Sequence, residues 1–353
     1  MPGVVVSSPH SARVNRTDWI MLQVILALVP GTLAMVWLFG WGVLINMALA
    51  SFFAVAFEAG VMKLRGRPVM PAIGDLSAVV TALLFAIAVP PTLPWWLTLV
   101  GIFFAIVVVK QLFGGLGYNP FNPAMAGYVF LLISYPLAMT TWLPPHIPEV
   151  LEAQGVVPLS FLDSLRLIFT GALPAELTWD AVSAATPLDE MRTQLDQNRM
   201  ISEIRQSPLW GDFGGRGWEW VGNAFLLGGI YLLARRVITW HIPVSMLAGL
   251  LAIAGVFWMF DPQAFPFPAF HMFAGGAILG AFFIATDPVS ACTTRKGQII
   301  FGASIGMLVF VIRTWGGYPD AVAFAVLLMN IAAPTIDYYT QPRVFGHRRR
   351  SSG

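Results

Sequence analysis

The side chains best suited to chemistry lie between Asp180 and Leu188, where the sequence reads DAVSAATPL. The hydroxyl of Thr186 follows three small residues, Ser183, Ala184 and Ala185. Pro187 favours extended backbone at the threonine that precedes it. No histidine or lysine stands nearby in the sequence to take the hydroxyl proton, so Thr186 is poorly suited to act as a nucleophile by itself. The pattern instead predicts a threonine that is displayed as the substrate of another enzyme.

The composition indicates which solvent surrounds this segment. Apolar residue types make up 57% of the 353 residues and charged types 11%, whereas soluble proteins have about 25% charged residues. A nucleic-acid binder, a disordered regulator and a conventional cytosolic enzyme are therefore excluded, and a net charge of +2 is too small to attract polyanions. The single cysteine, Cys292, excludes an internal disulfide and any cysteine-ligated iron–sulfur cluster or c-type haem held by this chain alone. We expect a membrane protein.

The hydrophobic pattern predicts an all-α fold with about ten transmembrane helices. A helix needs about 20 apolar residues to cross the hydrocarbon layer. Ten segments qualify, near 20–38, 42–62, 73–92, 95–110, 124–142, 218–236, 240–259, 269–287, 298–315 and 321–339. The first eighteen residues lack the apolar core of a cleaved signal peptide, so the first span is predicted to remain as an anchor.

The positions of the basic residues predict the orientation of the chain. Short loops rich in Lys and Arg stay in the cytoplasm. If the N-terminus is placed inside, most of the 20 Lys and Arg residues fall in segments on the cytoplasmic side. Both termini are therefore predicted to be inside. The predicted regions are a cytoplasmic N-terminus (1–19), a first five-helix half (20–142), a periplasmic segment (143–217), a second five-helix half (218–339) and a basic cytoplasmic tail (340–353).

The two halves have a similar local sequence. Lys110 to Leu131 reads KQLFGGLGYNPFNPAMAGYVFL, and Arg313 to Leu327 reads RTWGGYPDAVAFAVL. Each begins with a basic residue and continues with a Gly-Gly turn, Tyr, Pro and a small-residue helix. Because five spans precede the outer segment, the second half runs in the opposite sense, which is the inverted-repeat pattern of many transport folds. The alternative is that Gly, Tyr and Pro simply populate interfacial turns.

Few charges fall inside the predicted spans, where they are expensive and usually functional. Glu58 lies about one turn inside, and the other candidates lie at span ends: Asp75, Asp287, Asp337, His241 and His271. We expect these residues to cap helices or to sit at the interface. No carboxylate relay through this chain alone is evident.

A rigid inner loop precedes the fifth predicted helix. Each proline of Asn119-Pro120-Phe121-Asn122-Pro123 pushes its preceding asparagine out of helical geometry. The region is a candidate second flavin or quinone site, with four candidate residues: Gly114, Gly115, Asn119 and Asn122. Tight packing is the alternative. Tryptophans around the outer segment also have two interpretations: they form a belt at the membrane interface, or they stack on a bound flavin ring. The belt is favoured for Trp142, Trp218 and Trp220, and both interpretations stay open for Trp179 and Trp210.

The Asp180-x-x-Ser183-Ala184-Ala185-Thr186 pattern resembles the acceptor motif of membrane flavin transferases. These enzymes use FAD to attach FMN through a phosphoester to the final threonine, on the outer side of bacterial membranes. The charge distribution places residues 143–217 on that side independently.

Three further stretches extend the resemblance over roughly residues 15–345. They are Gly74-Asp75-Leu76-Ser77, the loop from Gly114 to Ala124, and Ala285-Thr286-Asp287-Pro288-Val289-Ser290. Together they resemble the D-type subunit of Rnf (Rsx) electron-transport complexes, a family related to the B-type subunit of the sodium-pumping NADH:quinone reductase.

This resemblance implies a non-autonomous electron-transfer subunit of an ion-translocating ferredoxin or NADH oxidoreductase in the bacterial inner membrane. Covalent FMN on Thr186 is the implied relay, with noncovalent riboflavin as a second cofactor. The implied partners are other membrane, flavin and iron–sulfur subunits, the lipid bilayer, and a flavin transferase during maturation. Two other hypotheses remain open: a channel or solute transporter of inverted-repeat fold without a redox cofactor, and a structural anchor for a larger complex.

Overall fold

The computed structural model describes residues 17–342 except 176, 208 and 319. The predicted end regions 1–19 and 340–353 therefore lie largely outside the described residues. Within the described part all regular secondary structure is helical, with two isolated β-bridges and no strand. Five helices, α1, α2, α13, α16 and α17, are long and apolar enough to cross a membrane. The protein is an all-α polytopic membrane protein, as predicted.

Each predicted span coincides with a helix or with a run of helices. The first half contains α1 (Thr17–Phe39), α2 (Gly42–Leu64), α3 (Val69–Gly74), α4 (Ser77–Ala88), α5 (Trp95–Phe103), the π-helix η1 (Phe104–Gln111), α6 (Pro123–Ser134) and α7 (Pro136–Thr140). The second half contains α12 (Trp218–Ala234), α13 (His241–Phe260), α14 (Pro268–Phe273), α15 (Ala277–Leu279), the π-helix η3 (Gly280–Ile284), α16 (Arg295–Trp315) and α17 (Val322–Thr340). The fifth predicted span is shorter than expected, because Pro136 separates α6 from α7.

The two halves repeat the same irregularity. The third span of each half is broken by a residue with left-handed backbone, Leu76 (φ 62°) between α3 and α4 and Gly275 (φ 64°) between α14 and α15. In each half a basic residue near the end of the fourth span reaches this break. Lys110 donates to the Ser77 hydroxyl, and Arg313 donates to the carbonyl of Ala274. The basic residue that begins each repeated stretch, Lys110 or Arg313, therefore occupies a corresponding place in the two halves.

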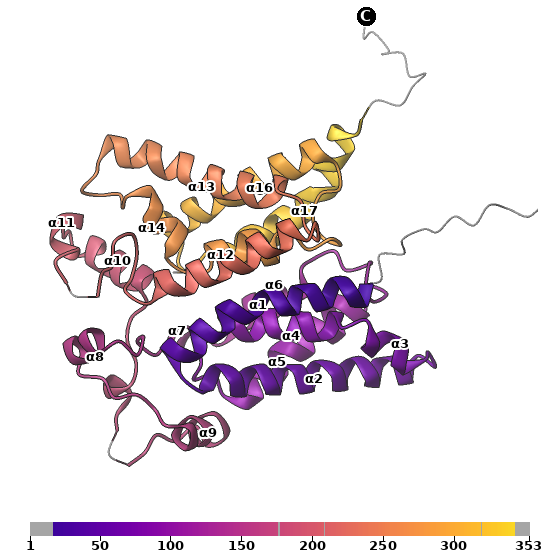
Figure 1. The fold of residues 1–353 in the computed structure, drawn as a ribbon, viewed down its shortest axis with the longest axis horizontal. Helices are drawn as coiled ribbons and strands as arrows, with labels where there is room; N and C mark the ends of the chain where they lie inside the picture. Colours follow the sequence, from indigo (N-terminus) through magenta and orange to yellow (C-terminus); the bar gives the residue numbers. More distant parts are fainter. Residues whose placement is uncertain (1–16, 176, 208, 319, 343–353) are drawn as a thin grey trace, which may run out of the picture.

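The halves pack against each other as two layers, with α1 beside α12 along their boundary (Figure 1). Glycines permit this close approach. A Cβ atom on Gly228 of α12 would lie 2.0 Å from the carbonyl oxygen of Ala27 in α1, and one on Gly31 would lie 2.2 Å from the ring of Phe225. Only a residue without a side chain fits at either position.

The segment between the halves consists of short elements at one end of the helices (Figure 1). They are α8 (Pro148–Gln154), α9 (Phe161–Thr170), the 3₁₀ turn η2 (Trp179–Ala181), α10 (Pro187–Asp196) and α11 (Ile201–Ile204). Its apolar side chains form two small clusters, one around Leu159, Leu167 and Val182, the other around Met191, Ile204 and Trp210. The short α3 lies at the opposite end of the helices.

Candidate functional site

Thr186 is the N-cap residue of α10. Its backbone is extended (φ −69°, ψ 159°), as expected for a residue before proline, and Pro187 occupies the first turn. The Thr186 hydroxyl donates to Oδ2 of Asp189 over 2.6 Å and accepts from the Asp189 backbone N–H over 3.3 Å. The residue that the sequence singles out is therefore held in one conformation at a helix start.

Short backbone contacts fix the rest of the DAVSAAT motif. The Ser183 hydroxyl donates to the carbonyl of Trp179 over 2.8 Å, and the Ala184 N–H donates to the carbonyl of Trp142 over 2.9 Å. Asp180 is exposed in η2. The structure thus brings only Thr186 of the motif to the cavity described next, and the other four predicted residues, Asp180, Ser183, Ala184 and Ala185, do not line it.

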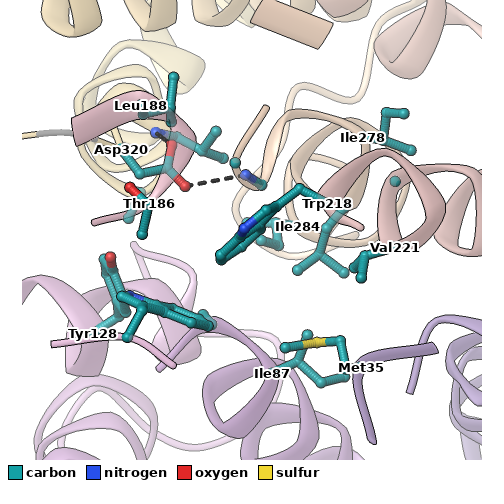
Figure 2. A pocket seen from close by; sticks show the side chains of 18 of the residues that line it. Met35, Ile87, Tyr128, Thr186, Leu188, Trp218, Val221, Ile278, Ile284 and Asp320 are labelled. Carbon is teal, nitrogen blue, oxygen red and sulfur yellow. Dashed lines mark hydrogen bonds between the residues drawn. The ribbon is translucent and has the colours of Figure 1, made fainter. Parts of the chain in front are cut away.

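A cavity of about 1030 Å³, measured out to its mouth, lies beside Thr186 between the two halves. We call it the outer cavity. Figure 2 shows Thr186 and Asp320 on one side, with the Tyr128 hydroxyl pointing toward them from the first half. Its remaining wall is largely apolar and includes the side chains of Met35, Met125, Trp142, Trp218, Phe225 and Ile278. A concave apolar site with a few convergent polar groups is typical of cofactor binding.

The carboxyl groups of this cavity are held by α10 and by the second half. Burial raises the pKa of the Asp189 carboxyl above its ordinary value, and this effect outweighs the hydrogen bonds from Thr186 and the charge of Arg192, which lower it. Asp320 accepts from the Gly276 N–H over 3.2 Å and pairs with Arg313 over 3.2 Å. The break in the third span of the second half is thereby tied to the wall of the cavity.

The tryptophans around this segment occupy different environments. Trp142 and Trp218 line the outer cavity and pack on each other, with ring centroids 5.3 Å apart. The sequence favours the belt for both, but the structure places them in the cavity wall, whereas Trp220 is 65% exposed. Trp179 is exposed, whereas Trp210 is buried against Phe270.

A second cavity, of about 920 Å³ measured out to its mouth, lies toward the other end of the halves. We call it the inner cavity. Asn119 and Asn122 line it, whereas Gly114 and Gly115 do not, so the structure brings together only two of the four residues predicted for a second site. Asn122 caps α6 by accepting from the Met125 N–H, and its own N–H donates to Asn330 across the halves. The inner cavity is therefore built from both halves.

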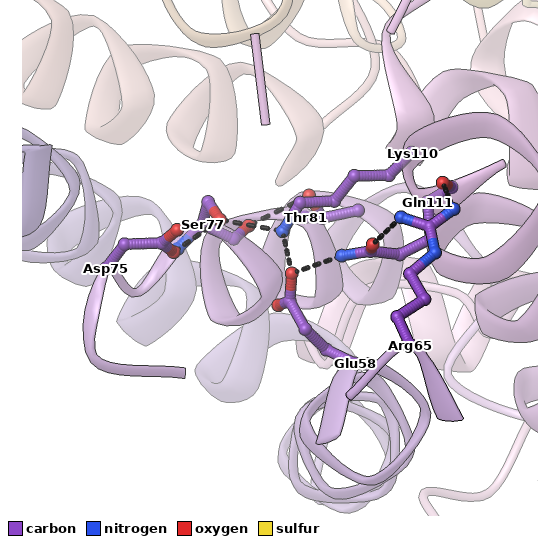
Figure 3. Close-up of polar contacts among 7 residues, drawn as sticks. All are labelled: Glu58, Arg65, Asp75, Ser77, Thr81, Lys110 and Gln111. Carbon is purple, nitrogen blue, oxygen red and sulfur yellow. Dashed lines mark hydrogen bonds and ion pairs between the residues drawn. The ribbon is translucent and has the colours of Figure 1, made fainter. Parts of the chain in front are cut away.

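Sequence reasoning missed a buried polar cluster at the wall of the inner cavity (Figure 3). Lys110, at the end of the predicted fourth span (95–110), is 1% exposed and pairs with Glu58 over 2.6 Å. Lys110 and Ser77 both line the inner cavity. The only signal in the sequence was a glutamate in the second predicted span and a lysine at the end of the fourth. Their spacing along the chain does not show that the two side chains meet.

Two of the span-end carboxylates bond backbone at a helix start, as predicted: Asp75 accepts from the Ser77 N–H, and Asp337 accepts from the N–H groups of Thr293 and Thr294. Asp287 instead accepts from the Ser290 hydroxyl in a turn. The prediction is wrong for Glu58 and His271, because both are buried inside the helix packing. Among the residues that the structure describes, His, Cys, Asp and Glu form no cluster of three or more that could hold a metal ion.

Two phenylalanines separate the cavities. Phe225 of α12 lines the outer cavity and Phe283 of η3 lines the inner one, and their rings pack edge to face with centroids 6.1 Å apart. The two cavities are thus close neighbours along the boundary between the halves.

Comparison with known proteins extends these observations. A sequence model described as the NQR2, RnfD, RnfE family matches residues 4–346. Among similar proteins, one from Alcanivorax borkumensis is 54% identical over 99% of this chain and 98% of its own length. Others from Escherichia fergusonii and Aliivibrio salmonicida are 49% and 51% identical, each over 98% of this chain and 99% of its own length. All three are named as the D-type subunit of an ion-translocating oxidoreductase complex. The match spans both halves and the segment between them, and the chain belongs to the NQR2, RnfD, RnfE family.

Proposed function

We propose that this protein is the membrane redox subunit of an ion-translocating oxidoreductase complex and carries FMN covalently linked to Thr186. The relatives named for that complex support the coarser part of this proposal. The observation that carries the finer part is the position of the Thr186 hydroxyl at the wall of an apolar cavity between the two halves.

The outer cavity has the properties that a tethered flavin requires. Aromatic and methionine side chains in its wall suit an isoalloxazine ring, and concave apolar sites with a few polar groups are typical of cofactor binding. The phosphodiester is ionic and favours a polar edge. Arg216, which lines a small neighbouring cavity with Ala185 and Pro187, provides a cation there. When bound, FMN would supply reversible electron transfer.

The residues around Thr186 have distinct tasks in this proposal. Pro187 and the cap of α10 hold the threonine at the cavity wall. Asp189 loses its hydrogen-bond donor when the hydroxyl becomes an ester oxygen, and burial favours the protonated carboxyl, which then donates instead of accepting. Trp142 and Trp218 limit access of water and lipid to the ring.

The inner cavity is the proposed site of a second, noncovalent flavin, riboflavin. Asn119 and Asn122 supply amide donors and acceptors for the edge of a planar heterocycle, and Lys110 supplies an ammonium group. No phosphate group needs to be neutralised there. Phe225 and Phe283 would stand between the two flavins.

The proposed topology is that of a bacterial inner-membrane protein with both termini in the cytoplasm and residues 143–217 in the periplasm. In this orientation a flavin transferase outside the membrane reaches Thr186 during maturation. Membrane, flavin and iron–sulfur subunits of the same complex would deliver and accept the electrons.

Fluorescence of the denatured chain tests the attachment. Purified protein, denatured and separated on a gel, should carry flavin fluorescence that disappears in Thr186→Val and persists in Thr193→Val, a matched control at an exposed threonine of the same helix. Fluorescence that survives in Thr186→Val contradicts the site. If the wild-type chain carries no flavin fluorescence and transports a solute on its own, the channel or transporter hypothesis is favoured, which the repeated halves also support.

A further inference from the structure

The Lys110 ammonium lies between the inner cavity and a row of hydrogen-bonded side chains, Ser77 and Asp75, that leads away from the cavity. We call this row the polar line. Nζ donates to Oε1 of Glu58 over 2.6 Å and to the Ser77 hydroxyl over 2.7 Å. An ammonium group has three N–H donors, and among the described residues only these two are used. Because Lys110 lines the inner cavity, its third donor is available to a molecule bound there.

The line continues from Lys110 to the end of the third span. The Ser77 hydroxyl donates to Oδ1 of Asp75, which lies at the break between α3 and α4 and is partly exposed. Figure 3 shows Asp75, Ser77 and Lys110 in sequence, with Glu58 beneath the ammonium. Three exchangeable groups thus connect the cavity wall to the end of the helices opposite the α8–α11 segment.

Glu58 makes the charged state of Lys110 the stable one. Its Oε1 accepts from both Lys110 and Gln111, and its Oε2 is buried with no hydrogen-bond partner among the residues that the structure describes. If Lys110 loses a proton, Glu58 is left as a buried, uncompensated charge, which is strongly unfavourable. The carboxylate therefore draws a replacement proton to Lys110.

The repeat provides an internal comparison. Arg313 occupies the corresponding place in the second half, donates to the carbonyls of His271 and Ala274, and pairs with Asp320. A guanidinium group does not release its proton in proteins, whereas lysine does so when buried. Arg313 therefore only ties the broken helix together, while Lys110 combines the same task with a transferable proton.

We propose that Lys110 is the proton donor to a redox group bound in the inner cavity and is recharged from the cytoplasmic solution through Ser77 and Asp75. This inference rests on the proposed function, which places a noncovalent flavin there. As an electron from a partner subunit reaches the group, one Nζ–H bond of Lys110 breaks and the proton passes to the group, leaving a neutral amine. Ser77 then gives its proton to Nζ and takes one from Asp75, which takes one from water.

The charges that face this line come from several elements. Glu58 lies on α2, Asp75 at the start of α4, and Asp287, after η3, lines the same cavity. Arg65, after α2, donates to both the side chain and the carbonyl of Gln111 at the edge of the cluster. Proton uptake should slow as the pH rises, because the relay takes its protons from the solution.

Proton uptake by the full-length chain tests the relay. The protein is purified in detergent in a Thr186→Val background, so that only the noncovalent flavin remains, and its flavin content is measured after extraction. Stopped-flow reduction with dithionite and a pH-indicator dye then reports uptake. Lys110→Arg keeps the charge but removes the releasable proton, and Ser77→Ala and Asp75→Asn interrupt the line. Each should slow uptake by roughly 100-fold at unchanged flavin content, in the range of general acid catalysis.

Two controls separate this role from packing. Thr314→Val is a matched control at a threonine that does not line the inner cavity. The Thr314 hydroxyl donates to the carbonyl of Phe310 in the same helix, and its loss should leave the uptake rate and its pH profile unchanged. The double variant Glu58→Gln/Lys110→Met removes both charges at once, keeps the cluster neutral and should also take up protons slowly. If Lys110→Arg and the double variant both bind flavin and take up protons at the wild-type rate, the relay is overturned and the proposed inner flavin site is not. A wild-type chain without noncovalent flavin overturns the relay together with the proposed inner site.

Discussion

The backbone N–H of Ala184 donates to the carbonyl oxygen of Trp142 over 2.9 Å, in an isolated antiparallel bridge. This contact joins the attachment motif to the end of the first half, two residues before Thr186. Trp142 in turn packs on Trp218 at the start of the second half. The proposed flavin attachment site is thereby fixed relative to both halves of the membrane domain.

The boundary between the halves should be sensitive to a single methyl group. Gly31→Ala places a Cβ atom 2.2 Å from the ring of Phe225, and overpacking of this kind costs about 1–3 kcal/mol. Gly60→Ala on α2 is the matched control, because no described residue lies within 4 Å of its Cβ position, and it should be neutral or slightly stabilising. Thermal unfolding in detergent measures both. Equal melting temperatures for the two variants would contradict the close packing.

The buried pair of Lys110 and Glu58 should behave as a unit. Lys110→Met leaves Glu58 buried without its counter-charge, and breaking a buried pair in this way costs about 3–5 kcal/mol. The double variant Glu58→Gln/Lys110→Met should regain most of this loss, because no isolated charge remains. Thermal unfolding of the two variants provides the comparison. A double variant no more stable than Lys110→Met would show that the two groups are not coupled.

The carboxyl of Asp189 predicts a pH dependence near Thr186. Burial raises its pKa in the folded chain, so the folded protein retains a proton that the unfolded chain releases. The contribution of the Asp189 carboxyl to the free energy of unfolding is fully present below the ordinary aspartate pKa. It is lost as the pH rises through the pKa that this carboxyl has in the folded protein. The melting temperature of wild type relative to Asp189→Asn should therefore fall between acidic and neutral pH. A constant difference would contradict the shifted pKa.

Labelling of single cysteines tests the orientation. In a Cys292→Ser background, exposed Ser202 of α11 and exposed Thr239 between α12 and α13 are replaced in turn by cysteine. An impermeant maleimide should modify Ser202→Cys in cells with a permeabilised outer membrane, and Thr239→Cys only after the inner membrane is broken. The reverse pattern would place the DAVSAAT motif on the side that an external flavin transferase does not reach.

Much of the fold follows from the sequence alone. Ten apolar segments and the similarity between the regions after Lys110 and Arg313 predict the helices and the repeated halves. The extended backbone of Thr186 likewise follows from Pro187. These features depend on local sequence, which hydrophobic patterning and proline geometry describe well.

The cavities and the buried cluster do not follow from local patterns. Lys110 lies on a π-helical extension of the fourth span that turns it inward to Glu58, 52 residues away in the sequence. Asn122 meets Asn330 across 208 residues. Such contacts depend on how the halves pack, which neither periodicity nor charge counting specifies.

The most direct test of the account is mass spectrometry of the peptide that contains Thr186. In protein isolated from its native membrane, this peptide should carry the mass of one FMN joined with loss of water, and fragmentation should place the adduct on Thr186. An unmodified peptide as the sole species, from cells in which the complex is active, would contradict the account.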